Sequence, residues 1–554
     1  MYKKNILVSH KAAFSDSAYM NLLFSDKTGT ITQNKMTVKE EVIYDKEMLN
    51  YICALCNEGL IINNEYKGDP TETSLYGYLY KNNIDALKVR KENKRIIDAP
   101  FDSERKLSTT INKIGDKTYL LCKGSIDNLL NKCAYINNNK ITNKDINDIK
   151  DSEKKLASKA LRVLGFAYKE INDIPQNSTE VINEENNLNF AGLLGMIDPP
   201  RDTVIKSVEM CKNAGIRPIM ITGDSLDTAS AIAKEIGIID NDNEGILGNA
   251  LDNYTDEELE QIVKNYSVYA RVNPEHKERI VKAWQKNGKV VAMTGDGVND
   301  APAIKDAHVG VGMGITGTDV TKSAADIVLM DDSFSTIIIA VEEGRRIYNN
   351  IRNNIVYSLS SNFAEIFTII IGLLSGNTIL LPIYILFIDL ITDSVPSICL
   401  AFEKSEKNIM SQKPRGLNKS LFTPFIKSCF ISSAIVETLF VCLTYFISLK
   451  LYNNEIAMSL ALLSMVVQEI IYSISCRNLK EPVFKQGLFS NKAMNIGLAI
   501  ILLIELLVFM TPIGKIISVE SIKPSLVLII FLINSSSFII YELLKPLLKK
   551  VFKD

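Results

Sequence analysis

The chain has 554 residues, with 62 lysines and arginines against 64 aspartates and glutamates, and its formal net charge is −2. This length exceeds what one hydrophobic core supports and predicts about three or four domains. The balanced charge gives no electrostatic reason to expect nucleic acid as a partner. Residues 1–333 mix charged and apolar residues as soluble domains do, whereas the remainder alternates long apolar runs with short polar loops.

The first informative segment is FSDKTGTIT at residues 24–32. The apolar stretch 20–24 predicts a buried strand, and Asp26 closely follows it. A carboxylate at the C-terminal tip of a strand lies where α/β sheets bind ligands. An aspartate in that position can attack a phosphoryl group and hold it as an acyl phosphate. We therefore predict that Asp26 is a nucleophile.

Two later segments repeat this design. PIMITGD at 218–224 and VVAMTGDGVND at 290–300 are apolar runs that end in Thr-Gly-Asp, and a helical segment at 228–236 follows the first. Strands that alternate with helices predict a mostly parallel, doubly wound sheet, with the acids on one edge. One such motif alone is weak evidence, because an aspartate after a strand is often a helix cap.

The ordered set resembles the P-type ATPases, in the cation-transporting branch of calcium and sodium pumps, and DKTGT continues into the TQNKMTV typical of that branch. The resemblance implies an α/β haloacid-dehalogenase-like phosphorylation domain at 1–37 and 190–333. It implies ATP as substrate and Mg²⁺ held by Asp26, the main-chain oxygen of Thr28 and Asp296, a small hard-oxygen set. Lys277 would neutralise the phosphate, and Asp300 would hold the metal shell or the backbone. The other cofactor-binding residues expected in this domain are Thr222, Gly223, Asp224, Arg271 and Asn299.

The insertion at 38–189 resembles the α+β nucleotide-binding domain of the same family. In this resemblance Phe101 stacks on adenine and Glu72 lies near its exocyclic amine, while Lys106, Lys123 and Arg162 meet the phosphates or the ribose. The family often has Lys-Gly-Ala where this chain has Lys-Gly-Ser at 123–125. An inserted domain also implies a hinge, because it must carry ATP to the nucleophile and withdraw. The alternative is that these charges form a solvated surface.

Residues 334–354 are predicted to form a stalk helix and 355–554 an all-α membrane bundle surrounded by lipid. About six apolar runs are long enough to cross a bilayer. They are 355–374, 379–400, 428–449, 456–475, 495–513 and 525–544. Arginines and lysines concentrate before the first run, in the loops 403–419 and 477–492 and at the C-terminus, which predicts that the soluble part and the C-terminus are cytoplasmic. The nine cysteines are then expected to be reduced thiols, and the composition weakly suggests a bacterial plasma membrane.

Polar residues inside the spans are candidates for the ion path, because they are costly in a bilayer. They are Asn362, Glu365, Asp389, Thr392, Asp393 and Glu469. Spacings of three and four predict a shared helix face within each of the first two spans. Pro382 and Pro396 would free carbonyl oxygens for coordination. Gln468 could add to the site, whereas Glu437 and Glu505 are lone acids that we expect to be peripheral.

The resemblance leaves the transported ion open. Calcium pumps usually have Asn at the position of Asp389, where animal sodium pumps have Asp, whereas Glu469 matches an acid of some calcium pumps. Ca²⁺ is the leading expectation, and a Na⁺, K⁺ or H⁺ pump is the alternative.

The resemblance covers only the latter part of the family's plan, since the sequence contains no Thr-Gly-Glu motif of the actuator domain and no early membrane spans. We expect a fragment, a half of a split pump with a second chain that carries the actuator, or a truncated product. Alone, it would bind ATP and phosphorylate Asp26 without completing transport.

Two other functional classes remain as alternatives. A membrane-tethered haloacid-dehalogenase-type phosphatase normally has a second Asp where Thr28 stands. A degenerate regulatory or assembly partner would not keep Asp26, Asp296, Asp300 and Lys277 together.

Overall fold

The computed structural model describes residues 2–10, 16–62, 65–416 and 420–552. The last three residues of the basic loop 403–419 therefore lie outside the described residues. The chain divides into two compact units, the first of residues 1–9 and 21–338 and the second of residues 10–20 and 339–554.

The first unit contains an eight-stranded sheet with Asp26 on a central strand. Neighbouring strands are parallel except at the β1 edge, which confirms the doubly wound α/β prediction. In spatial order the strands are β1 (Ile6–Val8), β18 (Ile327–Leu329), β17 (Val309–Met313), β16 (Val291–Gly295), β2 (Leu22–Asp26), β13 (Arg217–Thr222), β15 (Val268–Ala270) and β14 (Gly245–Leu247).

Strand β2 begins two residues later than the run 20–24 predicts. Asn21 and Leu22 both donate to the carbonyl of Val290, at 2.9 and 3.1 Å, so pairing with the sheet starts there. The strand continues through Asp26, which is its last residue rather than a residue beyond it.

The helices that pack on this sheet include α8 (Val204–Asn213), α9 (Leu226–Glu235), α12 (Pro274–Lys286), α13 (Ala301–Asp306) and α14 (Asp319–Ala324). Helix α9 begins before the predicted residue 228, because the Ser225 side chain caps it by accepting from the N–H of Thr228. Trp284 is buried on α12 in the same core as Phe24 and Ile221, so its role is packing.

The second sheet belongs to the inserted domain, which we define as residues 37–197. Its strands, in order, are β10 (Asn139–Lys140), β9 (Cys133–Ile136), β12 (Leu188–Ile197), β11 (Arg162–Ile171), β8 (Lys117–Gly124), β7 (Leu107–Ile114) and β6 (Arg95–Ala99), and β3 (Thr37–Ile43) also pairs with β12. All these pairs are antiparallel except β12 with β9. This confirms an inserted α+β domain.

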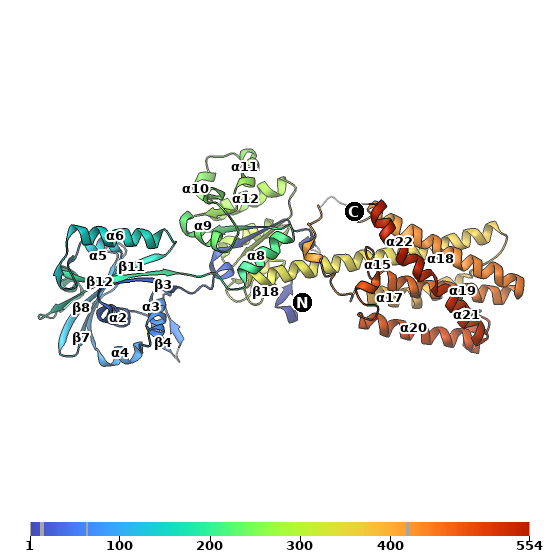
Figure 1. Cartoon of the computed structure of the whole chain (residues 1–554), viewed down its shortest axis with the longest axis horizontal. Helices are drawn as coiled ribbons and strands as arrows, with labels where there is room; N and C mark the ends of the chain where they lie inside the picture. The colour runs from blue at the N-terminus through green and yellow to red at the C-terminus, as the bar shows by residue number, and fades with distance from the viewer. Residues whose placement is uncertain (1, 11–15, 63–64, 417–419, 553–554) are drawn as a thin grey trace. The chain divides into compact units, whose positions relative to one another are not determined.

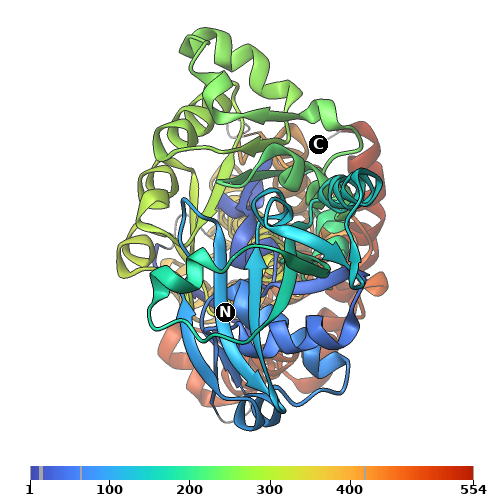
Figure 2. The same ribbon diagram turned by 90° about the vertical axis from the view of Figure 1, so that its left-hand side faces the viewer.

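Two groups of helices cover the two faces of this sheet (Figures 1 and 2). Helices α2 (Lys46–Leu55), α3 (Pro70–Lys81) and α4 (Ala86–Glu92) pack against one face, and α5 (Ile126–Leu130) and α6 (Asn143–Ala157) against the other. The smaller elements of the first unit include β4 (Leu60–Ile62), β5 (Glu65–Lys67), α7 (Ser178–Asn183), α10 (Gly248–Leu251) and α11 (Asp256–Ile262).

The second unit is a bundle of long apolar helices (Figure 1). Among the described residues six helical spans are long and apolar enough to cross a membrane, as predicted. They are α15 (Phe334–Leu374), the run α16 (Pro382–Phe387), η7 (Ile388–Asp393) and α17 (Ser394–Leu400), then α18 (Pro424–Leu451), α19 (Asn454–Ser475), α20 (Lys492–Met510), and α21 (Pro524–Ser535) with α22 (Ser537–Val551). Of the most apolar window of α19, 94% is buried inside the bundle, so α19 is its central helix.

Candidate functional site

The sheet brings the three strand-end motifs of the sequence to one edge. Strand β2 lies between β13 and β16, and Asp26 is aligned with Ile221, one residue before the end of β13. From the other side, the hydroxyl of Thr294 on β16 accepts from the N–H of Asp26 at 3.3 Å. The convergence follows from parallel pairing, because the carboxyl ends of neighbouring parallel strands share an edge.

Lys277 bridges two of the acids at this edge. Its Nζ atom donates to Oδ2 of Asp26 at 3.2 Å and to Oδ1 of Asp300 at 2.6 Å. Lys277 and Asp300 are buried. The second oxygen of Asp300 accepts from the N–H groups of Asp296 and Gly297, so Asp300 fixes both the lysine and the loop after β16.

Burial controls the protonation of this cluster. It raises the pKa of Asp26, and the charge of Asp300 adds to the effect, while Lys277 opposes it. The pKa of Asp296 is also raised, first by burial and then by Asp26 and Asp300. For Lys277, burial alone would lower the pKa, but the two carboxylates outweigh it and raise the pKa.

The three carboxylates suit a divalent cation. Oxygen atoms of Asp26, Asp296 and Asp300 lie within 4.8 Å of one another. Carboxylate and carbonyl oxygens are the ligands that Mg²⁺ prefers. Thr28 follows in the loop directly after β2, where its main-chain carbonyl could add an oxygen of the same kind. The residues present therefore fit Mg²⁺.

The other residues predicted in this domain gather around the same edge. Thr222 is buried, and its hydroxyl accepts from the N–H of Asp224 at 3.2 Å. Gly223 has no heavy atom within 4 Å of the place a Cβ would occupy, so its backbone is open to a ligand. The N–H of Arg271 donates to the carbonyl of Asp224 at 3.0 Å, while the side chains of Arg271 and Asn299 are exposed.

Sequence reasoning missed several residues of this site. Lys27 pairs with Asp224 at 2.5 Å and so joins the loops after β2 and β13. Arg201 donates to the carbonyl oxygens of Gly29 and Thr32, which holds the DKTGT loop in place. Lys27 lies inside the motif and could have been found there, whereas nothing local in the sequence distinguishes Arg201.

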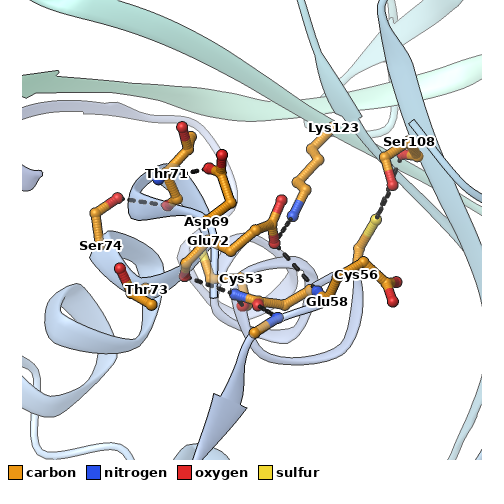
Figure 3. Close-up of polar contacts among 12 residues, drawn as sticks. Cys53, Cys56, Glu58, Asp69, Thr71, Glu72, Thr73, Ser74, Ser108 and Lys123 are labelled. Atoms are coloured by element: carbon orange, nitrogen blue, oxygen red, sulfur yellow. Dashed lines mark hydrogen bonds and ion pairs between the residues drawn. The ribbon is translucent and has the colours of Figure 1, made fainter. Parts of the chain in front are cut away.

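In the inserted domain the structure brings Glu72 and Lys123 together. Figure 3 shows the two side chains pointing at one another, from α3 and from the end of β8. Lys123 Nζ lies 2.5 Å from Glu72 Oε2, and the N–H of Glu58 donates to the same oxygen at 3.2 Å. Asp69 begins α3 as its N-cap and thereby places Glu72 in the first turn.

The other predicted nucleotide contacts are exposed. Phe101 is 64% exposed, in the loop between β6 and β7, which leaves its ring open for stacking. Lys106 and Arg162 also have exposed side chains. The carbonyl of Lys106 accepts from the N–H of Ser125 at 3.1 Å, and a Cβ at Gly124 would collide with that carbonyl. The glycine of the Lys-Gly-Ser segment is therefore required for this close approach.

The nine cysteines all lie within the described residues, and none of them forms a disulfide. Two of them, Cys53 and Cys56, have Cys-x-x-Cys spacing at the end of α2, which the sequence interpretation overlooked. Both are buried, and Cys56 Sγ donates to the carbonyl of Ser108 at 3.4 Å (Figure 3). Burial raises the pKa of both thiols, so they remain protonated and act in packing.

In the membrane bundle, Glu469 is the meeting point of three helices. The hydroxyl of Ser361 on α15 donates to one of its carboxylate oxygens at 2.6 Å, and the hydroxyl of Thr392 in η7 donates to the other at 2.7 Å. Glu469 and Thr392 are fully buried. Ser361 was not predicted, because serine is common in helices that pack closely.

Burial differs among the residues that were predicted to share a helix face. Residues 388–393 form a π-helix in which Thr392 and Asp393 are buried, whereas Asp389 is exposed but lies within electrostatic reach of Glu365 and Asp393. On α15, Glu365 is buried but Asn362 is exposed.

Pro396 lies in α17, three residues beyond this π-helix, and has no N–H group. It cannot donate to the carbonyl of Thr392, four residues earlier, and that carbonyl accepts instead from the hydroxyl of Tyr357 at 3.4 Å. The carbonyl that we expected this proline to free for coordination is therefore already bonded.

Buried carboxylate oxygens without a hydrogen-bond partner mark the surroundings of Glu469. Among the described residues they include Glu365 Oε1, Asp393 Oδ1 and both oxygens of Glu437. Glu437 is fully buried on α18 within electrostatic reach of Glu365 and Asp393, so the expectation that it is peripheral is wrong. Gln468 is engaged elsewhere, since it bonds to Asn534 and Tyr541.

Comparison with known proteins matches both units. A family model described as P-type ATPase, cytoplasmic domain N, matches residues 46–203, and one described as cation transporting ATPase, C-terminus, matches residues 377–547. The chain is 40% identical over 551 residues to calcium-transporting ATPase 1 of Bacillus cereus, an alignment that covers 92% of this chain and 61% of that protein.

Two further relatives extend the comparison. The calcium-transporting ATPase of Bacillus subtilis is 36% identical over 568 residues, which cover 95% of this chain and 63% of the relative. The potassium-transporting ATPase alpha chain 2 of Homo sapiens is 33% identical over 622 residues, 92% of this chain and 60% of the relative. The chain thus spans about 60% of the length of the relatives it matches.

Proposed function

The chain belongs to the P-type cation-transporting ATPases and is an integral membrane protein, and on that premise we propose that ATP phosphorylates Asp26 to drive cation transport. The observation that carries the proposal is the position of Lys277 between Asp26 and Asp300, beside Asp296. Lys277 opposes the burial that raises the pKa of Asp26 and so favours its anionic form, and the three carboxylates leave oxygen ligands for a metal.

The residues divide the chemistry of the transfer between them. An oxygen of Asp26 attacks the γ-phosphorus of ATP, the bond to the β–γ bridging oxygen breaks, and ADP leaves with the electron pair. Lys277 offers a positive charge to the phosphoryl oxygens, and the open backbone around Gly223 lets its N–H groups approach them. Bound Mg²⁺ on Asp26, Asp296 and the Thr28 carbonyl would neutralise the charge that gathers there.

The inserted domain is proposed to bind the adenosine part of ATP. The exposed ring of Phe101 supports stacking, and the exposed Lys106 and Arg162 can reach phosphate or ribose. Because Lys123 lies 2.5 Å from Glu72, we place both at the adenine end of the nucleotide.

Ca²⁺ is the proposed cargo. The relatives with 36–40% identity are named calcium-transporting ATPases, and the potassium-transporting ones are less similar, at 32–33%. Buried carboxylates and hydroxyls from α15, η7 and α19 form a hard-oxygen site, which suits Ca²⁺. Asp389, the acid that favours Na⁺, K⁺ or H⁺ transport, is exposed at the edge of that set, within electrostatic reach of Glu365 and Asp393.

The exposed Asn362 and Asp389 support a further proposal about partners. A carboxylate that faces lipid inside a span is costly, so we infer that more membrane helices cover this face. They would come from the rest of a longer protein or from a second chain, which would also supply the actuator domain. The basic loops favour a cytoplasmic position for the soluble part and the C-terminus.

Transfer of label from γ-labelled ATP to the full chain in membranes tests the proposal, with Ca²⁺, Na⁺, K⁺ or a chelator and with Asp26→Asn as control. We expect acid-stable label that requires Asp26 and rises with Ca²⁺. Label that rises with Na⁺ or K⁺ instead would reassign the cargo. Release of phosphate without a stable phosphoenzyme would favour the alternative function, a membrane-tethered haloacid-dehalogenase-type phosphatase.

A further inference from the structure

Glu505 on α20 is a buried acid that the proposed transport function does not use. Its side chain is 5% exposed, and neither carboxyl oxygen has a hydrogen-bond partner among the described residues. An unpaired polar group buried in an apolar region costs free energy even when it is neutral. A buried carboxyl without a protein partner therefore suggests that a bound ligand supplies its hydrogen-bond partner.

Glu505 lies in the wall of an apolar cavity between α19, α20 and α21. Every other residue that lines the cavity is aliphatic or phenylalanine, among them Val467, Phe509 and Phe531. The cavity is thus an apolar chamber with a single acidic group among its described lining residues.

The chemistry of the chamber excludes the common partners of a carboxylate. Its described lining contains no lysine or arginine. Ca²⁺ and Mg²⁺ take six or more oxygen ligands and Zn²⁺ takes about four ligands, whereas the wall offers one carboxylate. A buried water needs two to four polar partners, and Glu505 alone supplies too few.

We propose that this cavity binds an amphiphile with a primary ammonium group and an apolar chain. The ammonium donates to the carboxylate of Glu505, and the chain occupies the apolar volume. Glu505 lies five residues before the end of α20 at Met510, about 8 Å along the helix, so such a molecule reaches it from the membrane interface. The proposal does not depend on Asp26 or on the cargo.

Labelling of the purified full chain in detergent with dicyclohexylcarbodiimide tests the site. The reagent reaches protonated carboxyl groups from apolar surroundings. The acid adds across one carbon–nitrogen double bond, its proton passes to nitrogen, and an acyl shift gives a stable N-acylurea with no leaving group. Peptide mass spectrometry then measures the labelled fraction at each acid, with dodecylamine as the probe ligand and dodecanol as its uncharged match.

We expect label at Glu505 that dodecylamine suppresses, at about a tenfold lower concentration than dodecanol requires, because a charged hydrogen bond contributes at least about 1.4 kcal/mol. Glu437 is the matched control, since it is also buried and unpartnered among the described residues but does not line this cavity. Dodecylamine should not protect it.

A second measurement uses the thermal midpoint. Dodecylamine should raise the midpoint of the parent chain and of Glu437→Gln, but not that of Glu505→Gln or of the cavity-filling Leu502→Trp. No label at Glu505, equal protection by the two ligands, or an unchanged response of Glu505→Gln would each overturn the proposal.

Discussion

Lys123 and Glu72 form a close ion pair, with Nζ and Oε2 2.5 Å apart and only 5% of the lysine side chain exposed. The family resemblance places Glu72 near the adenine and Lys123 near the phosphates or the ribose, but in the structure the two side chains are in contact. The pair holds the lysine at the end of β8, beside α3.

Lys123→Met should weaken binding of adenosine and of ATP by the same factor, about tenfold, because the lysine acts at the adenine end. Calorimetric titration of the full chain with both ligands measures the two factors. Lys106→Met is the contrast, with the larger loss expected for ATP. If Lys123→Met weakens binding of ATP but not of adenosine, Lys123 contacts the phosphates instead of the adenine end.

Mg²⁺ binding should weaken as the pH falls from 7 towards the ordinary aspartate pKa of about 4. Burial raises the pKa of Asp26 and Asp296 above the ordinary value, so protons compete with the metal at a pH where free aspartate is ionised. In the metal-free chain the same shifts mean that the folded state binds more protons than the unfolded state in this range. Its stability should therefore fall as the pH rises through the folded pKa values.

Thermal midpoints of the full chain across this pH range, with and without Mg²⁺, measure both effects. Asp296→Asn should reduce the pH dependence. A Mg²⁺ stabilisation that falls only below about pH 4, where free aspartate protonates, would contradict the raised pKa values.

The sheet edge with Asp26 was predictable because each motif places an acid at the end of an apolar strand. Parallel pairing of the strands then brings these acids to one edge of the sheet. The membrane site was harder. The spacing of Asp389, Thr392 and Asp393 does not reveal that residues 388–393 form a π-helix, in which Thr392 and Asp393 are buried and Asp389 is exposed.

The inward position of Glu437 also has no local signal. In the sequence it is a lone acid within the apolar run that forms α18, and nothing in that run tells which side of the helix faces the bundle. Contacts between distant segments decide this, because packing against the other helices buries Glu437 and brings it towards Glu365 and Asp393.

Asp393→Asn should abolish the cation dependence of phosphorylation, whereas Asp389→Asn should raise the Ca²⁺ concentration needed without abolishing that dependence, because Asp389 lies on the face that we propose further membrane helices cover. Asp393 is buried beside the Glu469 site, and Asp389 is exposed. Label from γ-labelled ATP, titrated with Ca²⁺, measures both variants. Equal losses in the two would show that Asp389 also contacts the cargo.

Arg477→Met should destabilise the bundle by about 3–5 kcal/mol, because it leaves the carboxylate of Glu403 buried without its main partner. Arg477 donates to both oxygens of Glu403, at 2.8 and 3.1 Å, and both side chains are buried. The thermal midpoint in detergent measures the effect. Lys485→Met is the control, since its pair with Glu481 is exposed and should contribute less than about 1 kcal/mol.

Strands β3 and β12 enter and leave the inserted domain as an antiparallel pair, with Thr37 opposite Ile197. The two ends of the insertion are therefore only about 5 Å apart, one strand spacing. A turn of a few residues could replace the whole insertion without moving β2. In evolutionary terms, the sheet that carries Asp26 could gain, lose or exchange its inserted domain as a cassette.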